Sequence, residues 1–285
     1  MVPILIRSKD RVDYLNTTLK SLTASDIDNS MIVIADDCSE TDEMNAYLFS
    51  DNIIEIENKG WIDQITNEVT QDAYNYLRLD DYKEELTNFD LWNNYIGNIP
   101  YETKIKCIGK RFTTIRPNKN NGDVYGLLWT IMAGFELFKN TDRIIILEND
   151  LIFNKNWFNI ANHIYDRESA SKVGLVSVYN REFEDSNYLN LYEDRNNIGG
   201  VMYLIPRDVY TFLKRQGIYS MKTKIDESLG GDVFLQQFLT RYGYRILNTN
   251  DSYIQHIGIR SLCRPGRFIR CSRNFIQPYT WNEEF

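Results

Sequence analysis

An acidic triplet follows a strongly apolar run near the middle of the chain. Residues 144–147 read Ile-Ile-Ile-Leu, and Glu148, Asn149 and Asp150 come directly after them. Such a run is typical of a central strand of a parallel sheet, and ligands of open α/β sheets bind where such strands end. Mg²⁺ and Mn²⁺ are commonly held by one or two carboxylates together with water and substrate phosphates. The triplet therefore predicts a divalent metal and, with it, a nucleotide diphosphate.

A second interpretation of these residues is purely local. Asp150 or Asn154 could cap the helix predicted near Lys155, because short polar side chains accept hydrogen bonds from the first N–H groups of a helix. Short acidic motifs also recur by chance. The triplet alone leaves metal binding and helix capping open.

Length, charge and cysteine content limit the class of protein. The chain has 285 residues, 43% of them hydrophobic, which is enough for one large α/β domain or two small ones. Its net charge of -8 argues against non-specific coating of nucleic acid. The four cysteines show neither a C-x-x-C pair nor a dense framework, which is typical of reduced thiols and argues against structural zinc.

No apolar run approaches the roughly 20 residues of a membrane span, and residues 1–4 lack the start of a secretion signal. We therefore expect no membrane span and a location in the cytoplasm. The enrichment in Asn, Asp, Ile and Tyr suits a bacterium of low genomic G+C content or a cell infected by its phage.

The order of predicted elements indicates an α/β fold. The first 56 residues predict strands at 2–6, 31–35 and 53–56 and a helix at 12–22. Further strands are predicted at 104–112, 173–178 and 199–206, and further helices at 124–139, from about 155, from about 207, and through Leu239 after an opening at 226–232. Neither G-x-G-x-x-G nor a P-loop occurs, so phosphates must be held another way.

An ordered series of motifs in this chain resembles one enzyme family. The series comprises residues 2–6 with Asp10-Arg11, then Asp36-Asp37-Cys38-Ser39-Glu40, then Glu148-Asn149-Asp150-Leu151 with Trp157-Phe158 behind it, then Val176-Ser177-Val178-Tyr179-Asn180, and finally Gln255-His256-Ile257-Gly258. It is similar to the GT-A nucleotide-sugar glycosyltransferases, and among them to the N-acetylglucosaminyltransferase I type. The similarity covers most of the chain outside residues 57–104.

The resemblance implies a single GT-A domain over residues 1–285, an α/β, Rossmann-like fold. Its sheet would be mixed and mostly parallel, flanked by helices, with a helical insertion. The nucleotide-sugar half would comprise 1–56 and 105–150, the insertion 57–104, the acceptor and catalytic half 151–259, and an Arg-rich C-terminal segment 260–285.

The resemblance also implies roles for single residues. Asp37 would read the uracil, and Asp150, with His256, would hold Mn²⁺ or Mg²⁺. The other residues at the donor, a UDP-sugar, would be Arg7, Asp10, Arg11, Glu148, Asn149, His256, Arg264 and Arg267. Asn149 stands where the family carries an aspartate, which puts the geometry around the metal in doubt.

Transfer of the hexosyl or pentosyl group to a hydroxyl needs a proton acceptor. General-base catalysis is worth on the order of 10²–10⁴ in rate. Asp232, after Gly230-Gly231 at a predicted helix start, resembles the family's base in an inverting reaction, with Asp226 or Glu227 as substitutes. The alternative is an ordinary N-cap aspartate.

The two histidines and a run of arginines are less specific. His163 lies within a predicted helix and is expected to be a structural or surface residue. His256 could also be a structural residue, because a lone histidine more often is one than a metal ligand. Five arginines follow His256 with no acidic residue before Glu283: Arg260, Arg264, Arg267, Arg270 and Arg273. They form a solvated tail or bind phosphate of the donor or of an anionic acceptor. The acceptor thus stays open between a glycan and a hydroxymethylated base of DNA.

Two other functions compete with the transferase. A non-catalytic glycan-binding protein on the same fold would be consistent with Asn149. A sugar-nucleotide pyrophosphorylase would normally carry a glycine-rich loop after the first strand, where this chain has Arg-Ser-Lys-Asp-Arg at 7–11.

Overall fold

The computed structural model describes nine stretches of the chain: 1–27, 30–49, 104–108, 112–117, 120–180, 191–194, 199–218, 230–257 and 275–276. The predicted strand at 53–56, the predicted insertion up to residue 103, Asp226, Glu227 and the five arginines after His256 lie outside the described residues.

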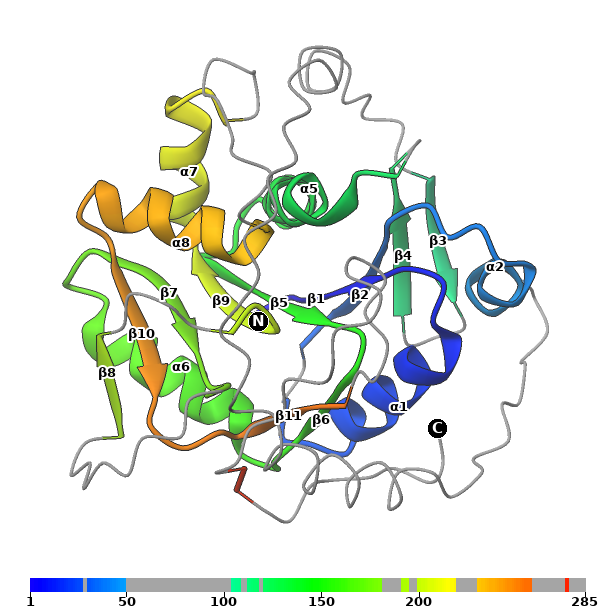
Figure 1. Ribbon diagram of the computed structural model, residues 1–285, viewed down its shortest axis with the longest axis horizontal. Coiled ribbons are helices and arrows are strands. Elements are labelled where there is room, and N and C mark those ends of the chain that lie inside the picture. Colours follow the sequence, from blue (N-terminus) through cyan, green and yellow to red (C-terminus); the bar gives the residue numbers. More distant parts are fainter. Residues whose placement is uncertain are drawn as a thin grey trace, which may run out of the picture.

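The described strands form one nine-stranded sheet in the order β3-β4-β2-β1-β5-β9-β7-β10-β8 (Figure 1). Their bounds are β1 Ile4–Ser8, β2 Ile32–Asp36, β3 Lys104–Ile108, β4 Phe112–Arg116, β5 Arg143–Glu148, β7 Val173–Ser177, β8 Tyr192–Asp194, β9 Met202–Pro206 and β10 Arg245–Thr249. Strands β4, β2, β1, β5, β7 and β10 run in one direction, and β3, β9 and β8 run in the other. The predicted mixed, mostly parallel sheet is confirmed.

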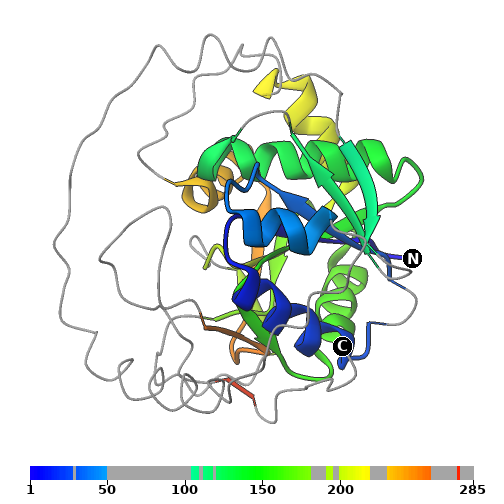
Figure 2. The ribbon, with the colours of Figure 1, turned by 90° about the vertical axis from the view of Figure 1, so that its right-hand side faces the viewer.

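Helices cover both faces of this sheet. One face carries α1 (Val12–Thr23), α2 (Asp42–Phe49) and α6 (Trp157–Glu168), and the other carries α5 (Gly122–Leu137), α7 (Arg207–Arg215) and α8 (Gly231–Arg241). Figure 2 shows α5 and α1 on opposite sides of the strands. Because side chains alternate along a strand, Ile4 and Ile6 of β1 enter one core and Leu5 the other. Burial on both faces explains why the central strands read as continuous apolar runs.

A second, two-stranded sheet brings the end of the described chain back to the acidic triplet. Strand β6 (Leu151–Phe153) pairs antiparallel with β11 (Ile254–His256), and His256 lies opposite Leu151. The Ile257 N–H donates to the Asp150 carbonyl at 2.9 Å. This pairing places His256 beside the triplet, although 106 positions separate it from Asp150 in the sequence.

Several predicted elements differ from those observed. The single strand predicted at 104–112 is two antiparallel strands, β3 and β4, with Ile108 opposite Phe112. The intervening Gly109 is a residue that weakens strands and favours turns. Strand β5, which ends at Glu148, is central, but it is parallel to only one of its two neighbours. It runs parallel to β1 and antiparallel to β9. No helix in the described part of the chain is long and apolar enough to cross a membrane.

Candidate active site

The candidate residues gather where β1, β2 and β5 end. Strand β1 lies between β2 and β5, and the chain leaves it through α1 on one face and enters β5 from α5 on the other. A reversal of strand order of this kind opens a crevice at the carboxyl ends of the strands, the usual ligand site of open α/β sheets. Arg7 pairs in register with Glu148 across this crevice.

The first two residues of the triplet are held by neighbouring polar groups. Arg7 Nη1 donates to Glu148 Oε1 at 2.7 Å. Asn149 is buried: its Oδ1 accepts from Arg11 Nη2 at 2.5 Å and its Nδ2 donates to Ser8 Oγ at 3.1 Å. An aspartate at 149 could not donate to Ser8, and it would add a negative charge between Glu148 and Asp150. The amide is therefore well suited to this position.

Charge is already crowded around Glu148. Burial raises the pKa of Glu148 to about 7; the positive charge of Arg7 opposes the rise, and the negative charges of Asp150 and Asp123 add to it. The negative charge of Glu148 beside Asp150 is therefore unfavourable, and the positive charge of Arg7 offsets part of this cost.

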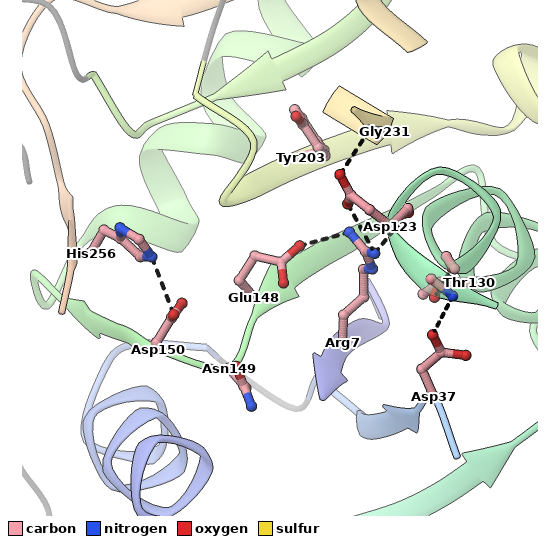
Figure 3. A network of polar contacts seen from close by, with 12 residues as sticks. Arg7, Asp37, Asp123, Thr130, Glu148, Asn149, Asp150, Tyr203, Gly231 and His256 are labelled. Carbon is pink, nitrogen blue, oxygen red and sulfur yellow. Dashed lines mark hydrogen bonds and ion pairs between the residues drawn. The ribbon is translucent and has the colours of Figure 1, made fainter. Parts of the chain in front are cut away.

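Asp150 is an ionised carboxylate in a nearly closed environment. Its side chain is 4% exposed, and its Oδ2 lies 2.8 Å from Arg11 Nη1. The same Oδ2 lies 3.2 Å from His256 Nε2 (Figure 3). Burial alone would raise the pKa of Asp150, but the charges of His256 and Arg11 and their hydrogen bonds hold it well below its usual range. Among the described residues, nothing donates a hydrogen bond to the buried Oδ1.

The orphaned oxygen fits a divalent cation. A buried anionic oxygen without a donor is costly, and a hard cation would satisfy it. Asp150 Oδ1 is an oxygen of the kind that binds Mn²⁺ or Mg²⁺, and His256 would join it as a ligand through Nε2 only after giving up its hydrogen bond to Oδ2. The described residues contain no group of three or more His, Cys, Asp or Glu arranged around one ion.

Neither residue of the capping interpretation caps α6, whose N-cap residue is Asn156 and which has no side-chain cap bond. Asn154 Oδ1 accepts the N–H of Asn156 at 2.9 Å, directly before α6 begins at Trp157. The carboxylate of Asp150 faces Arg11 and His256 instead. His163 is exposed on α6, as expected for a surface residue.

Asp37 and Asp10 both bind backbone N–H groups. Asp37 Oδ1 accepts from Asn121 at 2.7 Å and Oδ2 from Gly122 at 2.9 Å, which holds the start of α5. Burial raises the pKa of Asp37, while these bonds and Arg7 oppose the rise. Asp10 Oδ1 accepts two N–H groups just before α2, from Glu40 at 2.6 Å and Thr41 at 2.9 Å. A carboxylate has about four lone-pair sites, so both keep acceptor capacity for a nucleotide. Those contacts stay predictions.

Asp232 is brought to the triplet by β9 and α8. A Cβ built on Gly200 would lie 2.7 Å from Asp232 Cβ, so the two residues are in close contact. The next residue, Val201, accepts the Glu148 N–H at 2.9 Å. The proposed base and the acidic triplet are thus connected through the neighbouring residues Gly200 and Val201, while Arg264 and Arg267 lie outside the described residues.

Asp123 is a site residue that the sequence did not reveal. Its carbonyl accepts from Arg7 Nη2 at 2.9 Å, and its Oδ2 accepts the Gly231 N–H at 3.0 Å (Figure 3). The only sequence signal is an acidic residue in the first turn of a predicted helix, a position that acids favour in any helix.

Replacement of Asp37 by alanine should weaken UDP binding more than it slows the bound complex. The side chain is predicted to read the base and not the reacting carbon. The variant also loses the two bonds at the start of α5, which should cost about 0.5–2 kcal/mol of stability, as for a lost helix cap. Thermal unfolding without UDP measures the second effect, and the increment on adding UDP measures the first. An unchanged increment would remove Asp37 from the donor site.

Comparison with known proteins gives only distant similarities. No protein-family model and no curated protein matches the chain. Among solved structures, S. aureus TarS is similar at 12% identity and a TM-score of 0.47, over 89% of this chain and 36% of that one. TarS 1-349 in complex with UDP is similar at 14% identity and a TM-score of 0.45, over 89% and 60%. GalNAc-T7 with UDP, GalNAc and Mn²⁺ is similar at 12% identity and a TM-score of 0.47, over 87% and 42%. The chain thus spans less than two thirds of the length of each of these proteins.

Proposed function

We propose that this chain is a metal-dependent GT-A glycosyltransferase that moves a sugar from a UDP-sugar to an acceptor hydroxyl, with inversion at the anomeric carbon. One observation carries the proposal: the buried, ionised Asp150 keeps an oxygen without a hydrogen-bond donor beside His256, at the end of a central strand. The side chain of Asp150 makes no helix cap, and its unsatisfied oxygen is available to a cation.

The site would support this reaction through charge. Breaking the bond between the anomeric carbon and the diphosphate places negative charge on the leaving group, which a bound divalent cation neutralises. Asp150 and His256 would hold that ion. Arg11 bonds to both Asn149 and Asp150, and Arg7 bonds to Glu148, so the two guanidiniums fix the triplet and offset its charge.

Asp232 would accept the proton of the attacking hydroxyl. It lies against Gly200 and next to Gly231, whose N–H is bonded to Asp123 in the same crevice. Burial and the neighbouring Asp232 charge raise the pKa of Tyr203 well above its ordinary value, so this phenol stays neutral beside the carboxylate.

A ligand screen followed by turnover tests the proposal. A bound donor stabilises the folded state by mass action, so the right nucleotide sugar should raise the unfolding temperature, and more so with Mn²⁺. Release of UDP should then follow on adding an acceptor. If no nucleotide sugar stabilises the protein and none is turned over, the function is rejected. Stabilisation without turnover on any acceptor would indicate a binding protein.

The acceptor is proposed to be a glycan or a hydroxymethylated base of DNA, and salt separates the two. Contacts with DNA phosphates release condensed counterions, so turnover on modified DNA should fall steeply as salt is added. Turnover on a neutral oligosaccharide should change little over the same range. Robust transfer to the oligosaccharide together with none to the DNA would reject the nucleic-acid acceptor.

A further inference from the structure

The start of α8, where Asp232 lies, is fixed by a different helix. The first N–H groups of a helix have no partner within it. The N-cap residue of α8 is Gly230, with φ 78° and ψ 156°, and it makes no side-chain cap bond. The Gly231 N–H is satisfied instead by Asp123 Oδ2 of α5, at 3.0 Å. The orientation of the first turn of α8 therefore depends on a carboxylate that lies 108 positions earlier in the chain.

Two glycines let this turn approach its neighbours closely. A Cβ on Gly231 would lie 3.0 Å from the Asp123 carbonyl oxygen and 3.2 Å from Val124 Cα. A Cβ on Gly200 would lie 2.7 Å from Asp232 Cβ and 2.8 Å from its Oδ2. The distances at Gly200 are shorter than real Cβ atoms show, and those at Gly231 are tight enough that the neighbouring backbone must give by a few tenths of an ångström. Asp123, Gly200 and Gly231 thus form a seat around Asp232.

The same seat is bonded to the acidic triplet. Arg7 donates through Nη2 to the Asp123 carbonyl at 2.9 Å and through Nη1 to Glu148 at 2.7 Å (Figure 3). A continuous series of hydrogen bonds therefore runs from Glu148 through Arg7 and Asp123 to Gly231, the residue before Asp232. It joins the β5 end of the crevice to the α8 end.

We propose that this seat positions Asp232 against the donor site, with Asp123 and Gly200 as positioning residues for the transfer step. The inference rests on the proposed function. Misplacing a reacting group by about 1 Å can cost on the order of 10²-fold in rate. The Asp123 side chain is 40% exposed, and loss of its bond to the Gly231 N–H should lower the stability of the fold as a lost helix cap does, which thermal unfolding measures apart from kcat. Its effect on geometry is thereby separable from an effect on folding.

Asp123→Ala should lower kcat about tenfold or more while the KM for the UDP-sugar changes little. The variant loses the carboxylate that accepts the Gly231 N–H, but it loses no contact with the UDP-sugar. Asp123→Asn keeps an oxygen that can accept this N–H, so it should recover most of the lost kcat. Hydrogen exchange of the Gly231 amide should be faster in the alanine variant than in the asparagine variant. Asp42→Ala, which removes an exposed first-turn acid of α2, is the matched control and should leave kcat unchanged.

Gly200→Ala tests the other side of the seat without touching Asp123. The added methyl should displace Asp232 and lower kcat at saturating donor. Gly134→Ala is equally crowded, with Ile144 Cδ1 2.9 Å away in the core. It should lower the unfolding temperature but not kcat.

Two results would overturn the inference while leaving the function standing. One is a kcat within about twofold of the unchanged protein for both Asp123→Ala and Gly200→Ala. The other is an asparagine variant as slow as the alanine variant, which would mean that the charge of Asp123 and not its hydrogen bond is needed. Absence of sugar transfer by the unchanged protein would reject the proposed function, and the inference with it.

Discussion

Asp150→Asn is expected to lose nearly all metal-dependent sugar transfer. The change replaces a buried anionic oxygen, the only one among the described residues that lacks a donor, by an amide, which cannot match a carboxylate as a ligand for Mn²⁺. Neutralisation of the leaving group by a metal is worth several kcal/mol, so the loss should be on the order of 10²–10³ in kcat or more. Turnover across a Mn²⁺ titration measures it, and Mn²⁺ binding in the presence of UDP, followed by electron paramagnetic resonance, should weaken in parallel.

The same change weakens a buried ion pair, so folding needs its own control. Asp150 is paired with Arg11, and Asp36 is paired in the same way with Arg116 at 2.5 Å, at the end of β2, which lies on the other side of β1 from β5. Both carboxylates are almost fully buried. Asp36→Asn should therefore lower the unfolding temperature comparably while transfer at saturating donor stays metal-dependent. Near-normal activity of Asp150→Asn in Mn²⁺ would show that the metal site lies elsewhere.

The sequence predicts those strands and helices whose apolar residues follow a regular spacing along the chain. The apolar runs before Ser8, Asp36 and Glu148 are strands because each is buried on both faces, and α1 and α5 show helical spacing of their core residues. The acidic triplet is singled out by its place at the end of an apolar strand, and Asp232 by the family resemblance; the roles of both stay predictions. Three-residue strands such as β6 and β11 carry no periodicity long enough to detect.

The sequence does not show which residues from distant parts of the chain become hydrogen-bond partners through tertiary packing. Arg7 meets Asp123 across 116 positions, and the Asp123 carboxylate meets Gly231 across 108. Asp37 was predicted to read a base, and the structure shows in addition that it holds the start of α5. A carboxylate at a strand end looks the same in sequence whether it binds a ligand, a backbone or both.

The suitability of an amide at position 149 depends on the residues around it, which the sequence alone does not show. Glu148, with its pKa raised to about 7, and the ionised Asp150 flank it, so a third carboxylate would add repulsion in a nearly closed space. The amide bonds Arg11 and Ser8 without adding charge. Asn149 thus adds no charge beside Asp150, and its presence does not by itself argue against the proposed metal site.

Asp232→Asn should lower kcat on the order of 10²–10⁴ while the UDP-sugar still binds and still stabilises the protein, because an amide cannot accept the acceptor's proton. The alternative role, a first-turn acid that only favours the helix dipole, is worth about 0.3–1 kcal/mol of stability and nothing in kcat. Asp208→Asn is the control, because it removes the charge of a first-turn acid from α7, a helix outside the site. This variant should leave turnover unchanged. Direct displacement with Asp232 as base also requires a product of inverted configuration, which the anomeric coupling in an NMR spectrum reports. A product with the donor's own configuration would rule out this base and this mechanism together, since a retaining reaction does not need a proton acceptor at the start of α8 in the same step.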